Sequence, residues 1–251
     1  MRLAATAAIF AIAAMVGCRS NVAPAAACIP PGSLAVAAAD LSRVRSSPIY
    51  PQLPDGVRSM LENYPTAQHL MAAWSGAGLL LIAQGSFRKP PAGGTLVAPG
   101  LAVSGSAEAV RAALAQHRTG APGSPELLAY GSHAAGSSPI WVAVRGGVAL
   151  PLSGNFANLN RLLRNLRFAA LGVDLGSAVN LRLSGLGKDE AGAREFEESL
   201  RALLSLSAAG ESRHPEIAAL LDSVKVQREG VAVTAAVTVP AGELKMLAPG
   251  F

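Results

Sequence analysis

Residues that bind metals or form disulfides are scarce in this sequence. Its 251 residues include two cysteines, Cys18 and Cys28, and four histidines. No two histidines lie three or four positions apart, and neither H-E-x-x-H nor C-x-x-C occurs. The sequence therefore excludes the common zinc motifs and a multi-disulfide framework, and we expect no metal ion or other cofactor. The histidines are His69, His117, His133 and His214.

Motifs for enzymatic chemistry are also missing. There is no G-x-S-x-G elbow, and residues 185–188 (GLGK) lack the spacing of a phosphate-binding loop. Ser132 and His133 are adjacent in the chain, which does not aim one at the other. His214-Pro215-Glu216 fits half of the zinc deaminase motif, but the cysteine half is absent, so His214 is interpreted as a loop residue before a helix. We predict that the protein is not an enzyme. A hydrolase with dispersed catalytic residues is the alternative.

The charge balance gives no argument for a nucleic-acid partner. Charged residues make up 15% of the chain, and the formal net charge is +5. One of these positive charges, on Arg2, directly precedes an apolar stretch and is expected to be part of an export signal, so the surplus on the rest of the chain is smaller still. A nucleic-acid-binding domain needs a marked basic excess.

The amino terminus has the pattern of that export signal. Arg2 precedes an apolar stretch, residues 3–17, which is shorter than the ~20 apolar residues of a membrane-spanning helix. The stretch ends in Met15-Val16-Gly17-Cys18, which resembles the lipobox of bacterial lipoproteins. The resemblance implies a signal peptide over residues 1–17 and acylation of Cys18, so that the membrane becomes a partner through the lipid anchor.

Ordinary signal cleavage is the alternative to acylation. Ala25-Ala26-Ala27 fits an A-x-A site, and cleavage there would leave a soluble protein that begins at Cys28. The site lies far from the end of the apolar stretch, which favours the lipoprotein interpretation. Arg19, and not Asp, follows the lipidated cysteine. In a Gram-negative cell this implies a location on the periplasmic face of the outer membrane.

The segment after Cys18 is predicted to be a tether. Residues 18–32 contain Pro24, Pro30 and Pro31 and show no apolar periodicity. In an extended conformation such a segment spans roughly 40 Å. Cys28 is interpreted as a passive linker residue, with intermolecular pairing as the alternative. The folded domain is expected over residues 33–251.

Strand-like and helix-like patterns are mixed throughout that domain. Short runs joined by tight turns predict antiparallel pairing, and amphipathic segments predict helices over one face of the sheet, an α+β fold. The order strand, helix, hairpin occurs twice. Two related halves, 33–120 and 121–251, are one interpretation, and chance recurrence is the other. Predicted strands are 33–40, 69–74, 78–84, 95–104, 139–145, 168–174, 179–184, 225–228 and 231–239; predicted helices are 41–63 in two pieces, 106–116, one from 125, 155–167, 189–205 and one from 215.

Two short segments resemble a group of known sequences. Ala39-Asp40-Leu41, followed by Ser47-Pro48-Ile49-Tyr50, is similar to a segment of uncharacterised bacterial predicted lipoproteins. The later order of elements is similar as well. The resemblance supports the domain layout and implies no activity or catalytic residue.

Three arginines form a candidate anion-binding face. In the predicted helix 155–167, Arg161, Arg164 and Arg167 recur every third residue, on broadly one side. Clustered guanidinium groups can bind phosphate or carboxylate, although a solvated helix face is the alternative.

These observations predict a lipid-anchored cell-envelope protein that serves as a non-enzymatic binding or interaction module. Its expected partner, besides the membrane, is another envelope protein or an anionic envelope component. A carrier of a small apolar ligand is a further alternative to the hydrolase.

Overall fold

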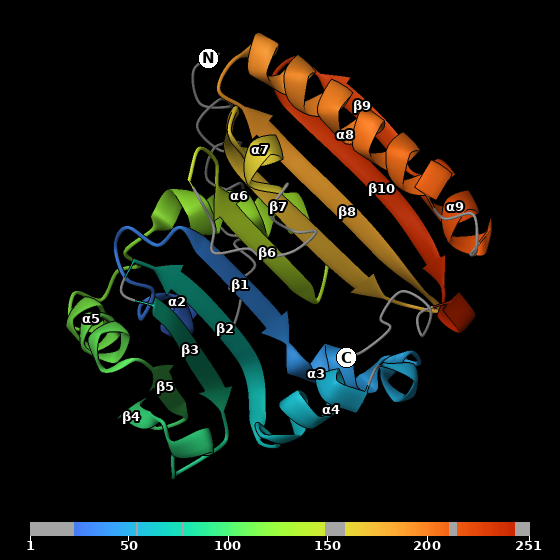
Figure 1. The fold of residues 1–251 in the computed structure, drawn as a ribbon. Helices are drawn as coiled ribbons and strands as arrows, with labels where there is room; N and C mark the ends of the chain where they lie inside the picture. Colours follow the sequence, from blue (N-terminus) through green and yellow to red (C-terminus); the bar gives the residue numbers. More distant parts are fainter. Residues whose placement is uncertain (1–22, 54, 77, 149–158, 211–214, 244–251) are drawn as a thin grey trace, which may run out of the picture.

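One antiparallel sheet organises the described part of the chain. The computed structural model describes residues 23–53, 55–76, 78–148, 159–210 and 215–243. Ten strands lie in the order β4-β5-β3-β2-β1-β6-β7-β8-β10-β9 (Figure 1). The predicted α+β class and the antiparallel pairing are confirmed. The strands are β1 (Ala35–Asp40), β2 (Ala67–Ser75), β3 (Gly78–Gly85), β4 (Thr95–Ala98), β5 (Leu101–Gly105), β6 (Ile140–Arg145), β7 (Leu166–Leu175), β8 (Ala178–Gly187), β9 (Lys225–Glu229) and β10 (Ala232–Pro240).

The helices differ greatly in length, from four residues in α2 to 21 in α8. None of the helices within the described ranges is long and apolar enough to cross a membrane. They are α2 (Ala23–Ala26), α3 (Leu41–Ser46), α4 (Asp55–Glu62), α5 (Ala107–His117), α6 (Pro125–Ala135), α7 (Leu159–Leu163), α8 (Glu190–Gly210) and α9 (Pro215–Asp222), with short 3-10 turns at Tyr50–Gln52, Pro91–Gly93 and Ala241–Glu243.

The two sides of the sheet have the same strand order. From the middle outward, one side runs β1, β2, β3, β5, β4 and the other runs β6, β7, β8, β10, β9. The two sides meet where β1 pairs with β6 in antiparallel register, with Ala37 opposite Val142. Each side also has helical structure between its first two strands. Helices α3 and α4 connect β1 to β2, and α7 lies between β6 and β7. An internal duplication remains a prediction, because strand order alone does not establish common descent.

Tight turns set most of the strand pairing as predicted. The hairpins β2–β3, β7–β8 and β9–β10 are all present, the last turning at Gly230 with φ of 55°. The predicted strand 95–104 is wrong in one respect, because it is two strands that pair with each other. Gly100 turns the chain there with φ of 72°, and a Cβ at this position would lie 2.3 Å from the carbonyl oxygen of Gly85.

Helices cover both faces of the sheet, over different strands (Figure 1). The helices α2, α5 and α6 pack on the face that carries Trp141 and Phe168. Helix α8 packs on the opposite face, against Ala169 and Ala235. The sequence predicts helices over one face of the sheet, and the structure has helices over the second face as well. Phe168 and Ala169 show this, because they are adjacent on β7, point to opposite faces, and are both buried. Helices α3 and α4 pack at the end of the sheet near Leu175.

The predicted tether is wrong over the part of residues 18–32 that the structure describes. Ala25, Cys28 and Ile29 have exposed fractions of 0% and belong to the core under α5 and α6. The carbonyl of Ile29 accepts a hydrogen bond from Gly123 N at 2.9 Å. These few apolar residues pack beneath two helices and belong to no helix or strand longer than the four-residue α2. Their burial therefore leaves no periodic pattern in the sequence by which it could be predicted. The folded domain therefore includes residues before Ser33.

Candidate functional site: a basic groove between α7 and α8

Of the three predicted site arginines, only Arg161 lies on a helix, and that helix, α7, is short. Helix α7 ends at Leu163, and β7 begins at Leu166, so the predicted helix 155–167 is wrong at its carboxyl end. The intervening backbone bonds to other segments, since Lys188 Nζ donates to the carbonyl of Arg164 at 2.9 Å and Lys188 N donates to the carbonyl of Asn165 at 3.1 Å. Residues 155–158 lie outside the described residues.

Because helix α7 ends at Leu163, the three arginines of the candidate anion-binding face do not lie on one helix. Arg161 and Arg164 remain together beside α8. Arg167 lies on β7, where its guanidinium is 5.5 Å from the centre of the Phe168 ring and 3.6 Å from Glu126 of α6. Its guanidinium is therefore directed to the face that α6 covers. The prediction of one shared face is correct for two arginines and wrong for Arg167.

Arg161 and Arg164 line a groove between α7 and α8. Its volume is about 400 Å³. One acidic residue, Glu195, lies in it and accepts a hydrogen bond from Asn165 Nδ2 at 2.6 Å. The far end is apolar, and Leu206 there is 73% exposed. The groove thus combines two exposed guanidinium groups with an exposed leucine. The lining residues are Arg161, Leu162, Arg164, Glu195, Ser199, Ala202, Leu203 and Leu206.

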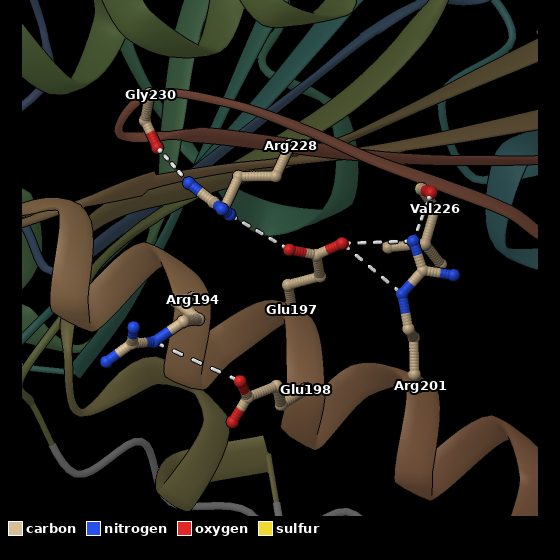
Figure 2. A network of polar contacts seen from close by, with 7 residues as sticks. All are labelled: Arg194, Glu197, Glu198, Arg201, Val226, Arg228 and Gly230. Atoms are coloured by element: carbon tan, nitrogen blue, oxygen red, sulfur yellow. Dashed lines mark hydrogen bonds and ion pairs between the residues drawn. The ribbon is translucent and has the colours of Figure 1, made fainter.

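A network of ion pairs fixes the other side of α8 to the sheet edge (Figure 2). Glu197 lies between Arg201 at 3.0 Å and Arg228 of β9 at 2.9 Å. Arg201 also donates to the carbonyl of Val226 at 2.7 Å. Hydrogen bonds from the two guanidinium groups lower the pKa of the Glu197 carboxyl. The wall of the groove is therefore held in place by contacts on its opposite side.

The spacing of Glu190 to Arg194 and of Glu197 to Arg201 predicts two i,i+4 ion pairs on α8, and the structure has one of them. Glu197 pairs with Arg201 as predicted. Arg194 lies 4.0 Å from Glu198, four residues after it, where the sequence predicted a pair with Glu190. The side chains of Arg194 and Glu198 are both well exposed, so this ion pair contributes little to stability.

A second, smaller pocket of about 250 Å³ lies at the end of β1. Asp40 and His69 line it and are opposite each other in the register of β1 and β2. The Asp40 carboxylate accepts a hydrogen bond from Arg43 N and caps α3, and Arg43 Nη1 donates to the carbonyl of Ser137 at 2.6 Å. These charged groups are thus used in joining α3 to the sheet. The sequence does not predict this pocket, because the pattern around His69 indicates only a strand.

Three of the four histidines lie in the part of the chain that the structure describes, and these three are dispersed over the fold. His133 is on the exposed side of α6, and His117 ends α5. His214 lies outside the described residues. Within the described ranges no three His, Cys, Asp or Glu side chains are grouped as metal ligands would be.

Cys28 is a core residue and not a linker residue. Burial raises the pKa of its thiol to about 11. Its Sγ lies 3.8 Å from Nδ1 of His117. An intermolecular disulfide at Cys28 would require the core to open, so the structure contradicts that alternative. Cys18, the predicted lipidation site, lies outside the described residues.

Comparison with known proteins gives a likeness of fold alone. No protein-family model matches the sequence, and no curated protein matches it. The structure reported as crystal form III of TP0453 has a TM-score of 0.53 and 11% sequence identity, covering 88% of this chain and 95% of that one. Crystal form IV of TP0453 has a TM-score of 0.51 and 11% identity, covering 88% and 94%. The α+β fold therefore has structural neighbours, and at this identity their likeness says nothing about activity.

Proposed function

We propose that the protein is a lipid-anchored, non-enzymatic envelope module that binds an anionic partner in the groove between α7 and α8. The lipobox pattern at Met15-Val16-Gly17-Cys18 supports the anchor. The observation that carries the binding function is the pairing of Arg161 and Arg164 with the exposed Leu206 in one groove. Guanidinium groups bind carboxylate or phosphate in a fork geometry, and an exposed leucine adds apolar contact.

The groove suits a segment of a partner better than a small ligand. It is open along α8, from Glu195 near the amino-terminal end of the helix to Leu206 near its carboxyl-terminal end. Arginine is one of the residue types enriched among the few side chains that carry most of the affinity of such surfaces. The expected partner is an acidic segment of an envelope protein or an anionic envelope polymer.

Site-specific photocrosslinking tests this proposal. A photoreactive side chain at Ser199, which lines the groove, should form one defined adduct in cells that make the full-length lipoprotein. The double reversal Arg161→Glu with Arg164→Glu should abolish the adduct. A matched reversal on the opposite face of the sheet, Arg182→Glu with Lys225→Glu, should leave it unchanged. An adduct of equal yield in both double variants would show that the groove arginines do not bind the partner.

A further inference from the structure

The distance between the lipid anchor and the folded domain is short. The described fold begins with α2 at Ala23, and five residue steps separate Cys18 from Ala23. A fully extended chain covers at most about 3.3–3.6 Å per residue, so five steps span at most roughly 18 Å. This is less than half of the roughly 40 Å expected for a tether over residues 18–32. The domain is thereby restricted to the immediate surface of the bilayer.

The chain enters the fold on one face of the sheet. Helix α2 and the residues after it pack with α5 and α6, which cover the face that carries Trp141. Ser33 N donates to Ser124 Oγ at 3.2 Å, and both Ser33 Oγ and Ser124 Oγ donate to the carbonyl of Pro30. Pro24 and Pro31 remain exposed beside these contacts. We use the term anchor face for residues 24–33, α5, residues 118–124 and α6.

Basic groups surround the point of entry. Arg111 on α5 and Arg118 at its carboxyl-terminal cap are exposed. Arg145 Nε donates to the carbonyl of Ser33 at 3.2 Å, and the guanidinium groups of Arg145 and Arg167 both lie within 6 Å of the Phe168 ring centre. The acidic residues on α5 and α6 are Glu108 and Glu126. The anchor face itself carries Arg111 and Arg118 against these two glutamates, and the positive surplus comes from Arg145 on β6 and Arg167 on β7 beside it, of which Arg167 lies 3.6 Å from Glu126.

We infer that the anchor face rests on the headgroups of an anionic phospholipid bilayer. The short connection brings this face to the membrane, and its arginines are attracted to the negative headgroup layer. Because α7 and α8 lie on the opposite face of the sheet (Figure 1), the groove between them is then directed away from the bilayer. The lipid anchor and the partner site thus occupy opposite sides of one sheet. This inference rests on the acylation of Cys18 in the proposed function.

Fluorescence quenching on vesicles tests the orientation. Ala115→Cys on α5 and Ala202→Cys on α8 replace exposed helical alanines on opposite faces, and each can carry an environment-sensitive probe. The native Cys28 is buried and does not compete for the label. The full-length acylated protein is reconstituted into vesicles that contain phosphatidylglycerol and a lipid with a nitroxide on its headgroup. We expect loss of fluorescence at position 115 and its retention at position 202.

Charge reversal distinguishes the contribution of the arginines to the orientation from the contribution of the short connection. In anionic vesicles, Arg111→Glu with Arg118→Glu should reduce quenching at position 115, whereas Arg161→Glu with Arg164→Glu should not. Equal quenching at positions 115 and 202, or stronger quenching at 202, would overturn the orientation. Vesicle flotation of the same samples is the control for the anchor. Protein that does not float disproves the lipid anchor, while protein that floats without the asymmetry disproves only the orientation.

Discussion

Replacement of Ile29 by alanine should destabilise the domain substantially, because this residue belongs to the core. Its exposed fraction is 0%, and it packs in the same cluster as Met71, Leu80 and Leu127. Truncation of a buried isoleucine to alanine typically costs about 2–5 kcal/mol, from lost burial and the cavity that remains. For a domain of this size each kcal/mol lowers Tm by roughly 2–4 °C. A loss of about 3 kcal/mol therefore lowers Tm by roughly 6–12 °C.

Thermal and urea unfolding followed by circular dichroism measure this effect on a form that begins at Ala23. The matched control is Met60→Ala, which removes an apolar side chain that is 52% exposed, and we expect a change within about 0.5 kcal/mol. A second comparison shortens the chain to begin at Ser33, which removes the predicted tether. If Ile29→Ala changes stability no more than Met60→Ala, and the form from Ser33 is as stable as the form from Ala23, residues 23–32 are a tether after all.

Three further predictions concern the core and the ion network. The Cys28 thiol should resist Ellman's reagent at mildly alkaline pH until denaturant is added, because its pKa is raised to about 11; rapid reaction in the native protein would contradict its burial. Glu197→Gln should lower the urea midpoint at neutral pH. A carboxyl with a lowered pKa stabilises the fold above its usual pKa, so the difference from wild type should shrink as pH falls through the lowered value, and a difference independent of pH would refute this assignment. Gly131→Ala should also lower the midpoint, since the new Cβ would lie 2.4 Å from the Trp141 ring, and overpacking of this kind costs about 1–3 kcal/mol; a stabilised variant would show that the ring moves freely.

The strands and helices with clear periodicity were predictable from the sequence. In residues 231–239, Val or Ala at odd positions alternates with Ala or Thr at even positions, and β10 follows that alternation with Val233, Ala235 and Val239 buried. In α8, Phe196 and Leu200 face the core as their spacing predicts. Ser106, a residue type that favours the position before a helix, accepts a hydrogen bond from Ala109 N and caps α5. In these elements one local pattern determines which side of the backbone is buried.

The site and the start of the domain depend on contacts between distant segments, which local patterns do not contain. The spacing of Arg161, Arg164 and Arg167 fits a helix, yet the backbone after Leu163 is held by Lys188 and enters β7. Ile29 was interpreted as part of a tether, because its neighbours show no periodicity and its packing partners lie far along the chain. The spacing in the sequence predicts that Arg161 and Arg164 lie on one face. It does not predict the groove that these two arginines form with α8.

Fatty-acid labelling of the protein in cells tests the lipid anchor most directly. Wild-type protein should incorporate labelled palmitate and fractionate with the membrane, whereas Cys18→Ala should lose both the label and the membrane association. Cys28→Ala should keep both, because that thiol is buried in the folded domain. Label that persists in Cys18→Ala would contradict the anchor, and with it the placement of the domain at the bilayer surface.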